Sequence, residues 1–421
     1  MKRRWLSILF GLIVAGVAIG LVVTKIHSAG DERAFQEQIR LARAEGLPTN
    51  WQEYAATIKP APSAENAAPL YRQLKGKTRT KDDPTKIDDN LLFHRNDKAL
   101  ASAETFLKQN QAVLEIAEKA SRLPRCWFDR DWSEGFAVLM PEFADMKFGA
   151  KLLALRGSIC ADRGDAKGAL ENVKQMLAVA GHAGEEGHVI SRLVREAIMT
   201  MAVQHLAYWS LVHRDQPAYA NAIRQGIDGL AKPNLKEEHR DELYAILSLV
   251  DLSVTPEGRK KLGIREEDVG AGEKIFPVFL SRPKAKLKIV KAIRAYWAAL
   301  DRPSSEQAPL FQSARTELGS GLLAFPTAFT CYESLAGGDD ATALRLPTWV
   351  SRRLQYTALQ RALSSRVVPR SIKTSDLPSP FDGKPLEYSF NGKQIVITAS
   401  GGSGDNGPAP LKVPPDRVFK K

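Results

Sequence analysis

A long apolar run at the start of the chain most constrains how this protein can fold. The nineteen residues from Trp5 to Val23 carry no charge, and as an α-helix they would extend roughly 28 Å, close to the thickness of a hydrocarbon core. Lys2, Arg3 and Arg4 precede the run, and positive charge stays on the cytoplasmic side of a membrane. We therefore predict a single-pass anchor in the inner membrane through Trp5–Val23, with the body of the chain in the periplasm.

Two interpretations of residues 1–29 stay open, a retained signal-anchor helix and a cleaved signal peptide. A signal peptide has an apolar core of about 7–15 residues, with small residues at the cleavage site. The run here is longer, and the nearest cleavage-like site, His27-Ser28-Ala29, has a bulky histidine where a small residue is needed. The sequence therefore favours a retained anchor.

The composition is that of a globular chain with a basic surface. Apolar residues make up 44% and charged residues 26% of the 421 positions, which is typical of folded domains and enough for a sizeable core. The net charge of +12 favours contact with anionic headgroups or an acidic polymer. A body outside the cytoplasm would not meet nucleic acid, so we expect no such partner.

The cysteine content argues against a disulfide-rich fold. Cys126, Cys160 and Cys331 are the three cysteines, and no two of them form a Cys-x-x-Cys pair. At most one disulfide can form, and whether one forms is left open. We expect the three thiols to behave as small buried hydrophobic groups.

Apolar periodicity predicts a mainly α-helical body, most clearly over residues 147–180. Apolar residues there recur at helical spacing on either side of Gly164-Asp165, which predicts an αα-hairpin of two amphipathic helices. Their apolar positions are Phe148, Leu152, Leu155, Ile159, Leu170, Val173, Leu177 and Ala180. Further helices are predicted over residues 31–45, 98–123, 189–212, 217–230, 237–252, 283–300 and 347–367. Charged loops are predicted over residues 76–90 and 255–272.

Two local signals add detail to the helical body. Residues Thr49–Gln52 have the spacing of a capping box with Thr49 as the N-cap. Residues Cys126–Trp132 form an aromatic loop, which we expect to cover the helical core.

The C-terminal residues 368–421 change from helical to β-forming patterns. The β-prone residues 387–390 and 393–398 flank Asn391-Gly392, the preferred pair for a type I′ hairpin turn. The Gly- and Ser-rich residues 400–407 predict a flexible tail. We therefore predict a mainly α fold in four parts. These are a transmembrane segment (1–29), a helical-hairpin domain (31–254), a second helical region (255–367), and a β-hairpin cap with a flexible tail (368–421).

One predicted hairpin resembles a repeat family. Residues Gly157, Cys160, Gly164-Asp165 and Ala169-Leu170 resemble half of a tetratricopeptide repeat, in which Gly-Asp opens the turn and the small alanine lets two helices approach closely. No second copy follows at a spacing of about 34 residues. This favours an irregular stack of TPR-like helical hairpins over a regular array.

The C-terminal segment resembles a second family. Residues Pro378–Tyr388 and 400–407 are similar to the C-terminal DPFxGxPLxY motif of uncharacterised membrane-anchored proteins of planctomycete and verrucomicrobial bacteria. A related motif closes type II secretion pseudopilins. Residues Glu65–Tyr71 and Arg163–Leu170 resemble the former group. The resemblance implies an anchored, helix-rich envelope protein. Met1–Trp5 does not match a prepilin leader, so filament assembly is not expected.

Residues 283–300 predict a basic amphipathic helix. Lys284, Lys288 and Lys291 form one stripe, beside the apolar positions of the other face. This stripe could rest on anionic headgroups close to the anchor. The alternative is an ordinary solvated face on a helix whose other face joins the core.

Residues with known chemistry occur only in isolated motifs. Glu185-x-x-His188 lacks the second copy that a di-iron bundle needs, and we expect His182 and His188 to be polar loop residues. His239-Arg240-Asp241 stands without the other kinase motifs. Asp129/Asp131 and Asp339/Asp340 are acidic pairs of a kind that is mostly solvated. The sequence therefore identifies no catalytic residue, and we expect no metal and no cofactor.

Two functions follow from this interpretation. The preferred one is a non-enzymatic binding or scaffolding role in the cell envelope, because stacks of helical hairpins present extended surfaces to partners. The alternative is a hydrolase of envelope polymers with carboxylates from distant segments. A cleft holding two acidic groups of shifted pKa would favour the enzyme, whereas an exposed apolar patch would favour the binding protein.

Overall fold

The computed structural model describes most of the chain between residues 29 and 319 and parts of the C-terminal region. The described ranges are 29–77, 84–93, 96–212, 240–265, 282–302, 316–319, 370–377, 384–390, 395–398 and 411–413, with isolated residues between them. The predicted anchor Trp5–Val23, Cys331, the acidic pair Asp339/Asp340 and the predicted tail 400–407 lie outside these residues. Within the described ranges, no helix combines the length and apolarity needed to cross a membrane.

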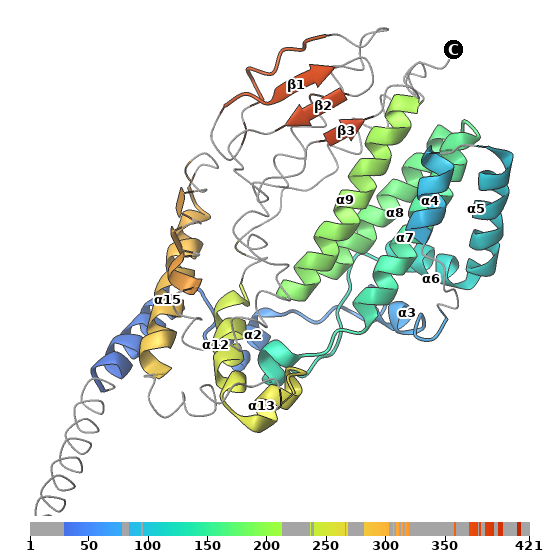
Figure 1. Ribbon diagram of the computed structural model, residues 1–421. Coiled ribbons are helices and arrows are strands. Elements are labelled where there is room, and N and C mark those ends of the chain that lie inside the picture. Colours follow the sequence, from blue (N-terminus) through green and yellow to red (C-terminus); the bar gives the residue numbers. More distant parts are fainter. Residues whose placement is uncertain are drawn as a thin grey trace, which may run out of the picture.

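The described part of the chain is mainly helical, as predicted, with a small sheet near the C-terminus (Figure 1). The first helix covers residues 29–44. The others are α2 (Trp51–Thr57), α3 (Ala68–Arg72), α4 (Pro84–Phe93), α5 (Asp97–Gln109), α6 (Gln111–Ser121), η1 (Trp132–Ala137), α7 (Glu142–Asp162), α8 (Ala166–Gly184), α9 (Val189–Val212), α12 (Glu242–Ser253), α13 (Pro256–Lys261) and α15 (Arg282–Ala299).

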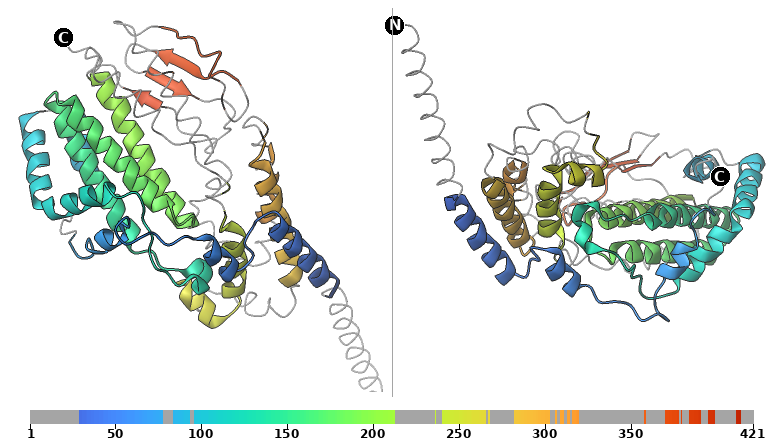
Figure 2. Two further views of the ribbon diagram at one scale, coloured as in Figure 1. Left: turned by 180° about the vertical axis from the view of Figure 1, so that it is seen from behind. Right: turned by 90° about the horizontal axis from the view of Figure 1, so that it is seen from below.

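Helices α7, α8 and α9 lie side by side and form the bundle, against which α4, α5 and α6 pack (Figures 1 and 2). The predicted αα-hairpin is confirmed in α7 and α8. Gly164 closes the turn with φ +77°, which favours glycine. The side chain of Asp165 then caps α8 by accepting a hydrogen bond from Gly168 N at 2.9 Å. Gly157 permits the close approach of α9, because a β-carbon there would lie 2.4 Å from Trp209 Cη2.

A second core lies at the other end of the molecule. It is built by the helix at 29–44, α2, η1, α12 and α15. Its buried members include Ile39, Tyr54, Trp132, Leu249 and Ile289. Because the whole cluster spans positions 39 to 318, the second core joins segments that are far apart in the sequence.

The C-terminal sheet has three antiparallel strands in the order β1 (Glu387–Phe390), β2 (Ile395–Thr398) and β3 (Leu411–Val413). The predicted hairpin is confirmed by the pairing of β1 with β2. β3 was expected to be part of a flexible tail, and it pairs with β2 instead. Ile395 and Ile397 bury one face of β2 in the core of the bundle.

Three predicted boundaries are wrong, because specific side-chain hydrogen bonds, two of them local and one between distant helices, override the sequence pattern. The helix predicted over 98–123 breaks at Asn110, which is buried and donates from Nδ2 to Phe106 O at 2.9 Å. Part of the loop predicted over 76–90 is helix α4, in which Asp88 bonds His205 of α9 at 2.5 Å. Part of the loop predicted over 255–272 is helix α13, which Thr255 caps.

The predicted capping box is displaced by one residue. Asn50, rather than Thr49, is the N-cap of α2, and its Oδ1 accepts from Glu53 N at 2.9 Å. Glu53 in turn accepts from Thr49 N at 2.8 Å. Glu53 thus takes the role expected of Gln52, but it accepts from the N–H of Thr49 and not from that of the N-cap Asn50, so only one of the two bonds of a standard capping box is present.

Candidate functional site

A cluster of buried charged side chains lies where the bundle meets the second core. Its members come from the loop after α6, the connection between α8 and α9, the first turn of α9, and the start of α12. We call it the junction cluster, and it comprises Arg130, Glu186, Arg192, Asp241 and Glu242. Buried charges are costly unless they are paired, so the pairing of each member decides what the cluster can do.

Arg130 and Glu186 form the first buried ion pair. Nε of Arg130 lies 2.8 Å from both carboxylate oxygens of Glu186, and the two side chains are 4% and 1% exposed. The guanidinium also lies over the rings of Phe128 and Phe143, at 4.7 and 5.4 Å. Burial raises the pKa of Glu186 to about 7 although Arg130 opposes the shift. Glu186 therefore keeps its proton to a higher pH than a solvated carboxyl does.

Arg192 forms the second buried pairing and bonds two acids of α12. Its Nη1 lies 3.0 Å from Asp241 Oδ1, and its Nη2 lies 3.0 Å from both oxygens of Glu242. Nη1 also donates to Gly187 O at 2.9 Å. Burial raises the pKa of Asp241 to about 7 against the attraction of Arg192. Because Arg192 belongs to α9, this pairing joins the bundle to the second core.

Three aromatic residues of the second core lie next to the two ion pairs. The ring of Tyr54 stacks on Tyr244 at 4.8 Å and meets the edge of Trp132 at 5.0 Å. The hydroxyl of Tyr54 donates to Glu186 O. Burial raises the pKa of both tyrosines. Both phenols are therefore neutral at physiological pH, and Tyr54 can hold the backbone next to Glu186 in place.

The two histidines expected in loops are buried. His182 lies within α8, between Tyr71 Oη at 2.9 Å and Leu123 O at 2.8 Å. His188 has no exposed surface, and burial lowers its pKa to about 3. Its Nδ1 accepts from Ile190 N at 3.2 Å, so the proton of the neutral ring lies on Nε2. The loop prediction is wrong for His182, which belongs to α8, whereas His188 does lie in the connection between α8 and α9. Both side chains are buried, and no local motif in the sequence indicates that burial.

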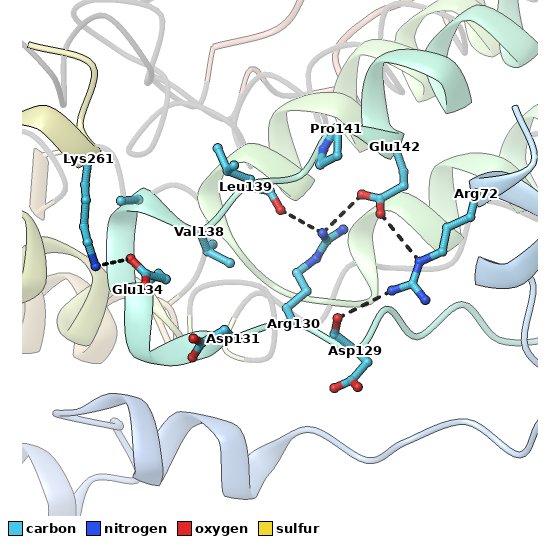
Figure 3. A pocket seen from close by; sticks show the side chains of 11 residues that line it. Arg72, Asp129, Arg130, Asp131, Glu134, Val138, Leu139, Pro141, Glu142 and Lys261 are labelled. Atoms are coloured by element: carbon cyan, nitrogen blue, oxygen red, sulfur yellow. Dashed lines mark hydrogen bonds and ion pairs between the residues drawn. The ribbon is translucent and has the colours of Figure 1, made fainter. Parts of the chain in front are cut away.

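A pocket of about 590 Å³ opens beside Arg130 (Figure 3). We call it the Arg130 pocket. Glu142 lies between two guanidiniums, with Oε2 3.2 Å from Arg130 Nη1 and Oε1 3.7 Å from Arg72 Nε. Across the pocket, Lys261 Nζ bonds Glu134 at 2.6 Å. The apolar part of the lining includes Leu139, which is 81% exposed. The pocket is thus charged on two sides and apolar at its edge.

A second pocket, of about 370 Å³, lies on the Glu186 side of the first ion pair. We call it the Glu186 pocket. It is more polar, and Tyr54, Lys59, Arg125, Trp127, Glu185 and Glu186 are among the residues that line it. Glu185 bonds the guanidinium of Arg125 and accepts from Cys126 N at 2.5 Å. The buried pair Arg130–Glu186 therefore has one member on each pocket.

The structure brings together several motifs that the sequence presents separately. Glu185, Glu186 and Asp241 all lie at the junction, whereas Asp129 and Asp131 are exposed at the rim of the Arg130 pocket, as expected for solvated carboxylates. In the described ranges, no three His, Cys, Asp or Glu side chains are grouped so that they could hold a metal ion. Cys126 is buried and Cys160 half-buried, both as free thiols, and burial raises the pKa of each thiol.

Sequence reasoning missed the two arginines that organise the junction cluster. Arg192 pairs with residues about fifty positions away, and Arg130 with a residue 56 positions away. The available signal was a charge at the start of a helix rich in apolar residues, Arg192 between Ile190 and Leu193. A buried partner is one explanation for such a charge, but the sequence does not say which partner.

Comparison with known families, curated proteins and solved structures finds no match to this chain. The fold and the site therefore define the class of protein by themselves. It is a mainly helical protein with two cores, a junction cluster of buried ion pairs between them, and a pocket on each side of one pair.

Proposed function

We propose that this chain is a membrane-anchored, extracytoplasmic binding protein that acts as a scaffold in the cell envelope. In this proposal Trp5–Val23 is the anchor. Lys284, Lys288 and Lys291 contact anionic headgroups, and the pockets at the junction face the periplasm. The observation that carries the proposal is the pairing of α15 with the helix at 29–44, which begins shortly after the proposed anchor.

These two helices run parallel. Near their starts, Lys286 Nζ lies 5.9 Å from the centre of the Phe35 ring. Near their ends, Arg294 Nε bonds Glu45 at 2.8 Å and Trp297 Nε1 donates to Glu45 O at 3.2 Å. Figure 2 shows the two helices side by side. The N-terminal part of α15 therefore lies beside the N-terminal half of the helix at 29–44, which follows the proposed anchor in the sequence.

The lysines of α15 have the exposure that contact with headgroups requires. Lys284 and Lys291 are exposed and Lys288 is half-buried, whereas Val290 and Ile293 face the second core. Each lysine near an anionic bilayer contributes on the order of 1 kcal/mol to attraction. Three such side chains beside an anchor would hold the body close to the membrane surface.

Lysine acetylation of the full chain in lipid nanodiscs tests this proposal. We expect Lys284, Lys288 and Lys291 to react several times more slowly in anionic nanodiscs than in zwitterionic ones, as measured by mass spectrometry. Lys174, which is exposed on α8, is the matched control and should react equally in both. Equal rates for the α15 lysines would contradict headgroup contact, and a reporter at Lys421 found in the cytosol would contradict the periplasmic location.

A second candidate function, hydrolysis of an envelope polymer, is favoured by one observation. Glu186 lines a polar pocket and has a pKa raised to about 7, which is a property of general acids. Its carboxylate is held by Arg130, and the neighbouring Glu185 is held by Arg125. We therefore prefer binding. Digestion of purified envelope polymer by the full chain, lost in Glu186→Gln while the fold is retained, would reverse that preference.

A further inference from the structure

We propose that the Arg130 pocket binds the C-terminal carboxylate of a short peptide whose last side chain is aliphatic. The proposal rests on the binding role proposed above and names a ligand class for it. It does not depend on the contact between α15 and the membrane. The volume of the Arg130 pocket, about 590 Å³, falls within the range of about 300–1,000 Å³ that small-ligand sites occupy.

Arg130 supplies a rigid donor at the base of this pocket. Its guanidinium is fixed by the two phenylalanine rings, by Glu186, and by Leu139 O, which accepts from Nη1 at 2.9 Å. Nη2 is buried and has no hydrogen-bond partner within the described part of the chain. A buried donor is costly to leave without an acceptor. A ligand oxygen at Nη2 would satisfy it, and the arginine would not have to be ordered first.

Arg72 supplies the second donor from the opposite side of Glu142 (Figure 3). Its side chain is half-exposed, and its contacts are long, 3.7 Å to Glu142 and 3.5 Å from Nη2 to Asp129 O. Guanidinium groups match the two oxygens of a carboxylate in geometry and charge. Glu142 and the buried Glu186 balance the two guanidiniums in charge. A further carboxylate would therefore be held by charge-assisted hydrogen bonds from Arg130 Nη2 and from the half-exposed Arg72, and not by a net positive charge.

The rim of the pocket limits the charge of the ligand. Asp129 and Asp131 are exposed there, and both carboxylates stand at the edge in Figure 3. Lys261 is already neutralised by Glu134. Like charges repel, so the two aspartates disfavour a phosphate or a polyanion more than they disfavour a single carboxylate.

The edge of the pocket also offers an apolar surface. Leu139 is 81% exposed, and Val138 and Pro141 line the pocket next to it. A large apolar side chain this exposed gains from being covered by another apolar group. Arg130 Nη1 bonds the carbonyl of Leu139, so the apolar surface and the proposed carboxylate site are adjacent. A C-terminal leucine carries both a free carboxylate and an aliphatic side chain, and can therefore contact both parts of the pocket.

Isothermal titration of the full chain in detergent tests the proposal with acetyl-Ala-Ala-Leu as the probe. We expect it to bind at least about tenfold more tightly than its C-terminal amide, because the amide lacks the charge that pairs with the guanidiniums. Replacing the last residue by serine should weaken binding about threefold. Loss of preference for the free carboxylate, or no binding at millimolar peptide, would overturn the proposal.

Two variants locate the binding in this pocket. Arg72→Gln should lower affinity for the free peptide about tenfold and leave the amide unaffected, because Arg72 is not required to hold Glu142 or Arg130. Arg163→Gln is the matched control, since Arg163 is an exposed arginine paired with Glu104 on the bundle. Leu139→Ser should weaken binding, and Leu310→Ser, at another exposed leucine, should not.

The peptide titration and the lysine acetylation together distinguish a failure of the peptide proposal from a failure of the proposed membrane contact. If the peptide does not bind while the lysines of α15 remain protected in anionic nanodiscs, only the ligand class is wrong. If the peptide binds and the lysines are not protected, the contact with the membrane is wrong. Equal affinity of Arg72→Gln and the unaltered chain for the free peptide would place any binding outside the Arg130 pocket.

Discussion

Nη2 of Arg192 lies 3.0 Å from both carboxylate oxygens of Glu242. Arg192 belongs to the helix that completes the bundle, and Glu242 begins the helix at the centre of the second core. Both side chains are almost fully buried. The two cores are therefore joined by a charged contact in addition to apolar packing.

Replacing Arg192 should destabilise the whole protein. Arg192→Met would leave Asp241 and Glu242 buried without their positive partner, which costs about 3–5 kcal/mol in comparable buried pairs. Denaturant unfolding followed by circular dichroism measures this loss. Arg163→Met, which removes an exposed pair, should change stability by less than about 1 kcal/mol. Equal effects of the two variants would show that the Arg192 contact does not join the cores.

The junction cluster should also make stability depend on pH. The pKa of Glu186 and that of Asp241 are both raised to about 7 by burial, whereas both groups ionise near pH 4 in an unfolded chain. Between about pH 4.5 and 7 the folded chain therefore binds more protons than the unfolded chain. The contribution of these two groups to the free energy of unfolding falls as the pH rises through this range. His188, with its pKa lowered to about 3, contributes a rise in stability between about pH 3 and 6.5.

Glu186→Gln isolates one of these contributions. The glutamine cannot ionise, so the stability of the unaltered chain relative to the variant should fall by on the order of 3 kcal/mol between about pH 5 and 8. Urea unfolding at both pH values measures the change. Glu115→Gln, at an exposed position on α6, is the control. Its free energy of unfolding should differ from that of the unaltered chain by the same amount at both pH values. A pH-independent difference for Glu186→Gln would mean that Glu186 titrates normally.

The hairpin of α7 and α8 could be predicted because its signals are local. Apolar spacing and the Gly164-Asp165 turn lie within one stretch of sequence, and the cap that Asp165 provides follows from the same residues. The first two strands were likewise predictable from Asn391-Gly392 and its β-prone flanks. In both cases, neighbouring residues supply the energy that specifies the structure.

Helix α4 and the junction cluster could not be predicted in this way. Residues 84–90 are polar, and they fold as a helix that places Asp88 against His205 of α9, 117 positions away. Arg192 and Asp241 become a pair only when α9 and α12 meet. Long-range partners determine these features, and a single sequence does not reveal which distant residues will come together.

The cap on α8 should contribute measurably to stability. Asp165→Ala removes the acceptor of the Gly168 N–H bond, and the loss of a helix cap costs about 1 kcal/mol. Asp165→Asn keeps the acceptor and should lose far less. Chemical denaturation of the three proteins compares them. If the alanine and asparagine variants are equally stable, the capping bond is not what Asp165 contributes.

Gly157 should be required for α9 to pack against α7. In Gly157→Ala the new methyl group would lie 2.4 Å from Trp209 Cη2 and 3.2 Å from Asn172 Cβ, so the buried indole would have to move. Gly181→Ala is the matched control, because a β-carbon there meets nothing within 4 Å. Both substitutions gain the same helix propensity, and overpacking costs about 1–3 kcal/mol. We therefore expect Gly157→Ala to be less stable than Gly181→Ala by that amount in denaturant unfolding. Equal stability of the two variants would mean that α9 can shift away from α7 without loss, and that the contact at Gly157 does not fix the spacing of the bundle.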